Sequence, residues 1–182
     1  MKNYIFMLPL ALLFSGCSNT IDPKIFEDNN SDTLIAVANI MAKNKSNVNG
    51  TITFTEIDGK VKMTVDISGL TPGDHGIHIH AIGDCVAADG SSAGGHWNPT
   101  NVGHGKWGIA PFHKGDIGNI LADSNGIGKL ILETDLWCIN CDDETKNIIG
   151  KAIIIHEGVD DYSSQPAGAA GDRIGCGKIM LE

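Results

Sequence analysis

The feature that most constrains the fold is a short-range alternation of apolar and polar residues, which recurs from residue 33 onward. In the run KVKMTVDI, over residues 60–67, every second residue is apolar: Val61, Met63, Val65 and Ile67. Successive side chains of a strand point to opposite faces, so this pattern is typical of a half-buried strand. Asp58-Gly59, just before it, predicts a tight hairpin turn.

Similar runs predict eight strands, at residues 34–40, 50–56, 60–67, 76–81, 119–123, 127–134, 149–156 and 174–181. The run 149–156 is almost continuously apolar, which indicates a buried strand. No segment has the period of an amphipathic helix of normal length. We therefore predict an all-β fold, an eight-stranded antiparallel sandwich or flattened barrel. Two long loops, over residues 82–118 and 157–173, interrupt it and are the expected place for a functional site.

The N-terminus has the composition of an export signal. Lys2 precedes an apolar run over residues 5–14 that is too short to span a bilayer as a mature helix. Leu13-Phe14-Ser15-Gly16-Cys17 resembles a bacterial lipobox, whose cysteine is lipidated. An ordinary signal peptide cleaved near Gly16 or Ser18 is the alternative, and both predict export to an oxidising compartment.

We divide the chain into a lipoprotein signal peptide (1–17), a polar flexible tether (18–32) and one folded domain (33–182). The predicted location is a bacterial cell envelope, on the periplasmic side, with membrane contact only through the lipid on Cys17. The net charge of −9 and the absence of a basic run argue against a nucleic-acid partner.

Six of the seven histidines lie between residues 74 and 118. His78 and His80 flank Ile79 in a predicted strand, so their imidazoles point the same way and form a bidentate clamp. Residues 96–116 are rich in Gly, Pro and Asn and have no sustained period, which predicts a long loop. A loop of this length inside a compact domain needs a function or an internal organiser.

Metal ions are the organisers that these residue types favour. His104, His113 and Asp116, with His96 as a fourth ligand, form a plausible tetrahedral zinc set. The clamp needs further nitrogens for a metal of its own. His156 and the second ring nitrogen of His96 are candidates, and all-imidazole ligation suits copper.

With Cys17 assigned to lipid, four cysteines remain, and they allow three pairings. Cys138 and Cys141 form a CxxC motif that could pair locally and leave Cys85 with Cys176. Half of a zinc site or a redox dithiol are the alternatives for CxxC. We favour a structural disulfide because there is no second CxxC and no surrounding βαβ pattern.

From residue 33 to the end, these motifs resemble the copper/zinc superoxide dismutase family, and specifically its exported bacterial branch. The resemblance implies a Greek-key order of strands and two metals that share one imidazole. It implies copper bound by His78, His80, His96 and His156, and zinc bound by His96, His104, His113 and Asp116. It implies a disulfide between Cys85 and Cys176, while Cys138 and Cys141 have no counterpart in the usual family pattern.

The resemblance also implies roles for residues outside the ligand sets. Arg173, within GDRIGCGKI, is expected to guide the anion, and Asp160 is expected to link a copper histidine to a zinc histidine without binding a metal itself. Because no lysine lies between His156 and Arg173, Lys106 or Lys114 are the candidates for substrate steering. Outside these roles, we expect His75 to be structural and the three tryptophans to be packing or surface residues.

The implied reaction is the disproportionation of superoxide into O2 and hydrogen peroxide by one-electron cycling of copper, which would protect the cell envelope. His96 and Arg173 are the expected catalytic residues, and the superoxide anion is the expected partner. A homodimer is compatible with the resemblance, which does not determine the oligomeric state. An envelope metal carrier would use the same histidines but needs neither Arg173 nor a bridging His96. A zinc hydrolase needs an open zinc position, which four protein ligands do not leave.

Overall fold

The computed structural model describes residues 33–182, so the predicted signal peptide, Cys17 and the tether lie outside the described residues. The described part contains eight strands and one short 3-10 helix: β1 (Leu34–Ala42), β2 (Asn49–Ile57), β3 (Lys60–Ser68), β4 (Gly73–His80), η1 (Ser91–Ala93), β5 (Gly118–Ala122), β6 (Gly128–Thr134), β7 (Ala152–His156) and β8 (Arg173–Leu181). Within residues 33–182, no helix has the length and apolar character that a membrane span requires.

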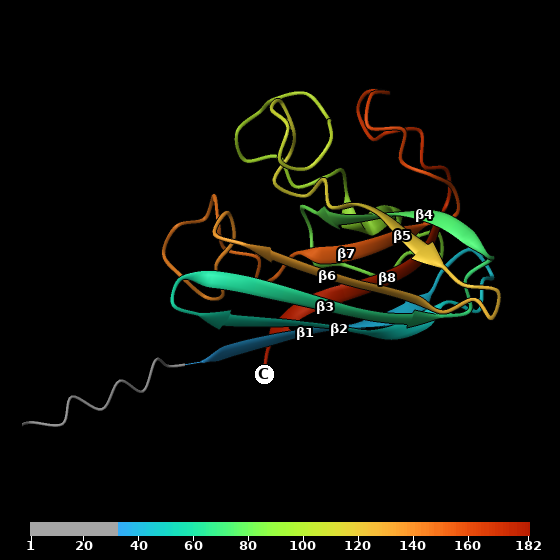
Figure 1. The fold of residues 1–182 in the computed structure, drawn as a ribbon, viewed down its shortest axis with the longest axis horizontal. Helices are drawn as coiled ribbons and strands as arrows, with labels where there is room; N and C mark the ends of the chain where they lie inside the picture. The colour runs from blue at the N-terminus through green and yellow to red at the C-terminus, as the bar shows by residue number, and fades with distance from the viewer. Residues whose placement is uncertain (1–32) are drawn as a thin grey trace, which may run out of the picture. The chain divides into compact units, whose positions relative to one another are not determined.

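All eight strands pair antiparallel and close into a barrel in the order β1-β2-β3-β6-β5-β4-β7-β8. Figure 1 shows β1, β2, β3 and β6 on one side of the barrel, with β4, β5 and β7 on the other. Because β3 pairs with β6 and β4 pairs with β7, neighbours in the sheet are not always neighbours in the sequence, as a Greek key requires. The predicted all-β, eight-stranded antiparallel fold is confirmed.

Strand β3 shows why this sequence forms a barrel. Its burial alternates strictly, and the four predicted inward residues are each at most 2% exposed: Val61, Met63, Val65 and Ile67. The preceding turn places Asp58 at φ 51° and Gly59 at φ 73°. Positive φ at both positions is the geometry of the type I′ hairpin that Asp-Gly predicts.

Strand β7 is buried along its whole length because it is covered on both faces. Ile153 and Ile155 belong to the barrel core, whereas Ile154 packs outward against Ala93 and Cys176 under the loop after β4. The strand begins at Ala152, three residues later than the sequence predicts. Residues 148–151 form a turn instead, in which the Lys151 amide donates to the Ile148 carbonyl at 3.3 Å and Gly150 has φ 78°.

The two long connections, residues 81–117 and 157–172, fold back over the outer face of β4 and its neighbours (Figure 1). The Gly115 carbonyl accepts from the Ile79 amide at 2.9 Å, and the Gly158 carbonyl accepts from the Gly76 amide at 2.8 Å. Gly76 permits this close approach, since a Cβ there would lie 2.9 Å from the Ala170 side chain. The loops therefore bury a strand face that would otherwise be exposed.

Candidate metal centre

The outward face of β4 supplies the first two imidazoles. His78 and His80 are 0% and 1% exposed, while Ile77 and Ile79 point into the barrel core. The alternation of the strand thus puts two adjacent imidazoles under the loops and two isoleucines in the core. The predicted pair of imidazoles is therefore present on one face of β4 and is buried.

Two further histidines, from the first long loop and from β7, join this pair. One ring nitrogen of each lies within 4.8 Å of the others, in the group His78, His80, His96 and His156. Four buried nitrogens of these side chains have no hydrogen-bond partner: Nδ1 of His78 and Nε2 of His80, His96 and His156. Buried lone pairs without a donor are costly, and one cation can satisfy all four. The group therefore fits an all-nitrogen metal site of the kind that copper favours.

The second nitrogen of each ring fixes the orientation of the lone pair. His80 Nδ1 donates to the Gly94 carbonyl at 2.8 Å, and His156 Nδ1 donates to the Gly171 carbonyl at 3.1 Å. A carbonyl oxygen only accepts, so the proton sits on Nδ1 and the lone pair on Nε2. Each long loop thus sets the tautomer of one ligand.

A second group gathers around the Asp116 carboxylate. Asp116 Oδ1 lies 2.8 Å from His96 Nδ1, 3.0 Å from His113 Nδ1 and 3.1 Å from His104 Nδ1. The His104 contact lacks hydrogen-bond geometry, and that nitrogen is otherwise unpartnered. His113 Nε2 donates to the Val102 carbonyl at 3.1 Å, which leaves its Nδ1 facing the group. Three imidazoles and one carboxylate, all buried or nearly so, fit a tetrahedral zinc site with no open position.

His96 belongs to both groups. Its Nε2 faces the four-histidine set, whereas its Nδ1 faces Asp116. The ring lies 4.1 Å from the His78 ring, measured between centroids, and 5.7 Å from the His113 ring. One imidazole therefore stands between the two sites.

Asp160 links the two groups from behind. Its Oδ2 accepts from His78 Nε2 and its Oδ1 from His104 Nε2, both at 2.9 Å. Asn119 holds Asp160 in place, because it accepts from the Asp160 amide at 2.8 Å and donates to its carbonyl at 2.9 Å. Asp160 thus contacts one histidine of each group.

Burial keeps three imidazoles of the copper-type set neutral, those of His78, His80 and His156. Desolvation lowers the pKa of His78 to about 4, although the hydrogen bond to Asp160 opposes it. The same cause lowers the pKa of His156 to about 3 and that of His80 well below its usual value. Neutral imidazole is the form that donates a lone pair to a metal, so these three side chains are ready to bind one near neutral pH.

The two carboxylates of the centre, Asp116 and Asp160, are held in the charged form instead. Burial alone raises the pKa of Asp116, but hydrogen bonds from His96 and from the amides of His113 and Gly105 outweigh it and bring the pKa below its usual range. In Asp160 burial is likewise outweighed, chiefly by the hydrogen bond from His78, so its pKa is also lowered. Both groups are therefore ionised and can offset the charge of a cation.

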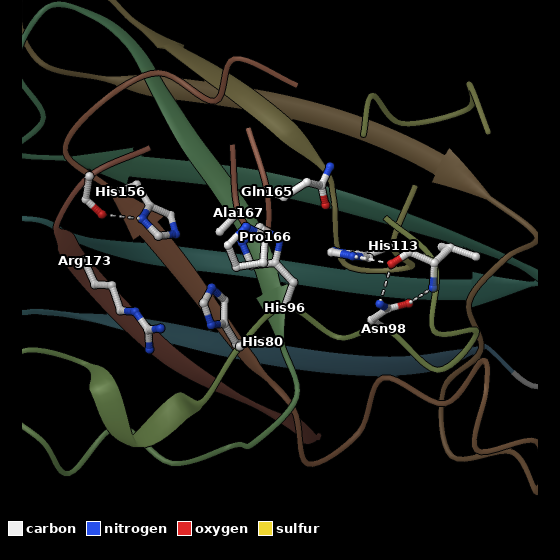
Figure 2. Close-up of a pocket in the computed structure, with 12 residues that line it drawn as sticks. His80, His96, Asn98, His113, His156, Gln165, Pro166, Ala167 and Arg173 are labelled. Atoms are coloured by element: carbon white, nitrogen blue, oxygen red, sulfur yellow. Dashed lines mark hydrogen bonds between the residues drawn. The ribbon is translucent and has the colours of Figure 1, made fainter. Parts of the chain in front are cut away.

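Arg173 lines a cavity of about 450 Å³ together with His80, His96 and His156 (Figure 2). Its guanidinium donates to the carbonyls of Gly90 at 2.8 Å and Gly94 at 2.7 Å. The loop that provides these carbonyls is joined to β8 by the disulfide between Cys85 and Cys176. Burial lowers the pKa of Arg173 from its usual value, yet the group stays a cation. The cavity thus carries a fixed positive charge beside His80 and His156 (Figure 2).

Other predicted residues fall outside the cavity. His75 is buried and bonded through its ring to the carbonyls of Thr71 and His156, as expected for a structural histidine. Neither candidate steering lysine lines the cavity. Lys114 donates to the Leu136 carbonyl, and Lys106 lies over the Tyr162 ring. Cys138 and Cys141 form a disulfide with each other, and neither belongs to a metal-binding group.

Sequence reasoning missed Gln165. Its side chain accepts from the His104 amide at 2.8 Å and donates to the His104 carbonyl at 2.9 Å, so it holds the main chain of a zinc-type ligand. It also lines the cavity in Figure 2. A single glutamine in a loop of small residues has no spacing that would reveal this contact.

The comparisons with known proteins agree with this geometry. The model of the copper/zinc superoxide dismutase family matches residues 48–179. Copper/zinc superoxide dismutase 3 of Arabidopsis thaliana is 39% identical over 160 residues, which is 82% of this chain and 92% of that protein. The copper/zinc superoxide dismutase of Paramecium bursaria Chlorella virus 1 is 43% identical over 142 residues, 72% of each chain. The crystal structure of the clock protein EA4 matches with a TM-score of 0.72 at 35% identity, over 81% of this chain and 94% of that one. The chain therefore belongs to the copper/zinc superoxide dismutase family.

Proposed function

We propose that this superoxide dismutase works through copper held by His78, His80, His96 and His156, and zinc held by His96, His104, His113 and Asp116. The observation that carries the proposal is the His96 ring, which offers one nitrogen to each group. A carrier of a single metal has no need for such a shared ring, and a zinc hydrolase needs a position that the four-ligand set does not leave.

When bound, copper supplies the one-electron redox couple that turns two superoxide anions and two protons into O2 and hydrogen peroxide, and zinc supplies fixed charge. The chain's own groups do the rest. Arg173 attracts the anion and orients it beside His80 and His156. His96 Nε2 has no protein partner, so when it is not bound to copper it can hold a proton and pass it to the reduced product. Asp160 keeps His78 and His104 in position.

The test is an activity assay on tag-free protein loaded with both metals, with the same concentration of free copper as the control. We expect superoxide consumption well above that of free copper, and inhibition by cyanide, which is a copper ligand. Full copper occupancy with no activity beyond the control would favour the carrier instead.

For its place in the cell, the proposal is a bacterial envelope lipoprotein that protects the periplasmic side from superoxide. The support is the lipobox-like segment before Cys17. Membrane-fraction protein should yield an N-terminal peptide with the mass of a lipidated cysteine, and Cys17→Ser should move the protein to the soluble fraction. Unmodified protein cleaved elsewhere would leave an ordinary exported enzyme. Whether the enzyme is a homodimer is a separate prediction, which sedimentation of the metal-loaded protein decides.

A further inference from the structure

The connection between β6 and β7, residues 135–151, carries a CxxC motif that the metal centre does not use. The Cys138–Cys141 disulfide closes a short loop within it. The Cys138 amide donates to the Lys146 carbonyl at 2.9 Å, and the Ile148 amide donates to the Cys138 carbonyl at 3.1 Å. These bonds join the two arms of the connection. They hold the backbone of Cys138 in place, and with it the position of the residue before it.

That residue is Trp137, and it is 1% exposed. Its indole ring meets Phe54 of the barrel core edge-on, with 6.3 Å between centroids, and lies 5.1 Å from the Trp107 ring. Trp107 belongs to the loop that carries His104 and His113. The indole therefore packs between the barrel core and the loop that holds the zinc-type ligands.

Hydrogen bonds make this contact specific. Trp137 Nε1 donates to the Lys114 carbonyl at 2.9 Å, and Lys114 Nζ donates back to the Leu136 carbonyl at 3.2 Å. Lys114 lies in the tight turn between two zinc-type ligands, in which the Asp116 amide donates to the His113 carbonyl at 3.1 Å. The connection thus contacts Lys114 in the middle of the turn that carries two of the four zinc-type ligands.

The opposite side of this turn rests on β4. The Gly115 carbonyl accepts from the Ile79 amide at 2.9 Å, and the Gly115 amide donates to the Trp97 carbonyl at 3.0 Å. A Cβ at Gly115 would lie 2.2 Å from the Ile79 carbonyl oxygen, so the contact is as close as a backbone allows. This support also serves the copper clamp on β4, whereas the support from Trp137 reaches only the zinc-type turn.

We propose that Trp137, fixed by the Cys138–Cys141 loop, is a positioning residue that holds the turn from His113 to Asp116 in its metal-binding geometry. The inference rests on the zinc half of the proposed function. Groups that orient metal ligands from outside the ligand shell typically change metal affinity by 10- to 100-fold when they are removed. Trp137 acts in this way through the backbone of the turn rather than through a ligand ring.

The test compares zinc dissociation constants, measured by competition with a chromogenic chelator, and the visible spectrum of Co²⁺ bound in place of zinc. Trp137→Phe keeps an aromatic ring but loses the N–H, and Lys114→Met removes the returning bond. Phe54→Leu is the matched control, because it loosens the packing under Trp137 without touching the turn. We expect about a tenfold loss of zinc affinity and an altered Co²⁺ spectrum in the first two variants. Copper affinity should stay unchanged in all three.

A second arm addresses the loop itself. Cys138→Ser with Cys141→Ser should also weaken zinc binding, and adding Trp137→Phe to it should cost less than Trp137→Phe costs alone. Zinc affinity and a Co²⁺ spectrum in Trp137→Phe equal to those of Phe54→Leu would overturn the inference. So would an equal loss of copper and zinc. Failure of the wild-type protein to bind zinc at His104, His113 and Asp116 would instead overturn the proposed function.

Discussion

The two ring nitrogens of His96 face two different groups of side chains. Nδ1 lies 2.8 Å from the Asp116 carboxylate, while Nε2 is buried without a protein partner beside the other three histidines. The bond to Asp116 fixes the ring plane, and so the direction of Nε2. A substitution here should therefore act on both metals, whereas loss of a ligand of one group should act on one.

We expect His96→Ala to lower the content of both copper and zinc after loading, because each set then keeps only three of its four ligands. His104→Ala should lower zinc content several-fold and leave copper near that of the wild type. Metal analysis of the dialysed variants by mass spectrometry measures both. Loss of one and the same metal alone from both variants would contradict the shared ring.

Arg173 is held at two carbonyls, so its charge stays in place whether or not an anion is present. Steering by a focused positive charge accelerates association by roughly 10-fold or more. We expect Arg173→Ala to slow superoxide consumption about tenfold or more while copper content is unchanged, with partial recovery in Arg173→Lys, which keeps the charge but loses the fork. An unchanged rate in the alanine variant would rule out anion guidance by this residue.

At the scale of elements, the two disulfides differ in what they close. Cys85 and Cys176 are 91 residues apart and join the first long loop to β8, whereas Cys138 and Cys141 are three apart within one connection. The chain-entropy model gives about 4–5 kcal/mol for the long closure and about 2 kcal/mol for the short one. The long disulfide should therefore dominate the stability of the metal-free fold.

We expect Cys85→Ser to lower the free energy of unfolding by about twice as much as Cys138→Ser combined with Cys141→Ser. Urea unfolding of metal-free protein without reductant measures both differences. Because the Cys85 loop also carries Gly90 and Gly94, Cys85→Ser should in addition slow the loaded enzyme through Arg173. Equal losses of stability in the two variants would show that closure length is not the controlling factor.

The same scale shows what the sequence can and cannot predict. Strand β3 is predictable because its period of two has one cause, the barrel core. The start of β7 is not, since the apolar run continues through Ile148 and Ile149, which pack against the core from a turn rather than a strand. The ligand sets are predictable because metal ligands belong to few residue types at constrained spacing. Trp137 and Gln165 escape because their roles depend on backbone carbonyls and amides that are distant in sequence.

At the scale of the whole molecule, the metal centre is a cluster of buried polar side chains between the barrel and its two long loops. Without metals, three buried imidazoles of the copper-type set, those of His78, His80 and His156, stay neutral because burial lowers their pKa values. In the unfolded chain the same side chains titrate near pH 6.5. The folded and unfolded states therefore bind different numbers of protons over a defined range of pH.

This difference sets the direction of the pH dependence. Between pH 6.5 and about 4, the unfolded chain takes up protons on these histidines and the folded protein does not, so acid favours unfolding. Each histidine contributes a slope of up to roughly 1.4 kcal/mol per pH unit in this window. The contribution is fully present above pH 6.5 and is lost as pH falls to the folded pKa, about 4 for His78. Asp116 and Asp160, whose pKa values are lowered, add a further loss only below about pH 4.

We therefore expect metal-free protein to lose several kcal/mol of unfolding free energy between pH 7 and pH 4.5, measured by urea unfolding at constant ionic strength. His156→Gln removes one of the three groups and should reduce the slope in this window while leaving the behaviour below pH 4 unchanged. Loading with copper and zinc adds stability that depends on metal concentration, so the comparison needs fully chelated samples. A free energy that is flat from pH 7 to 4.5 would mean that these three imidazoles titrate alike in the folded and unfolded states, and that burial does not lower their pKa values.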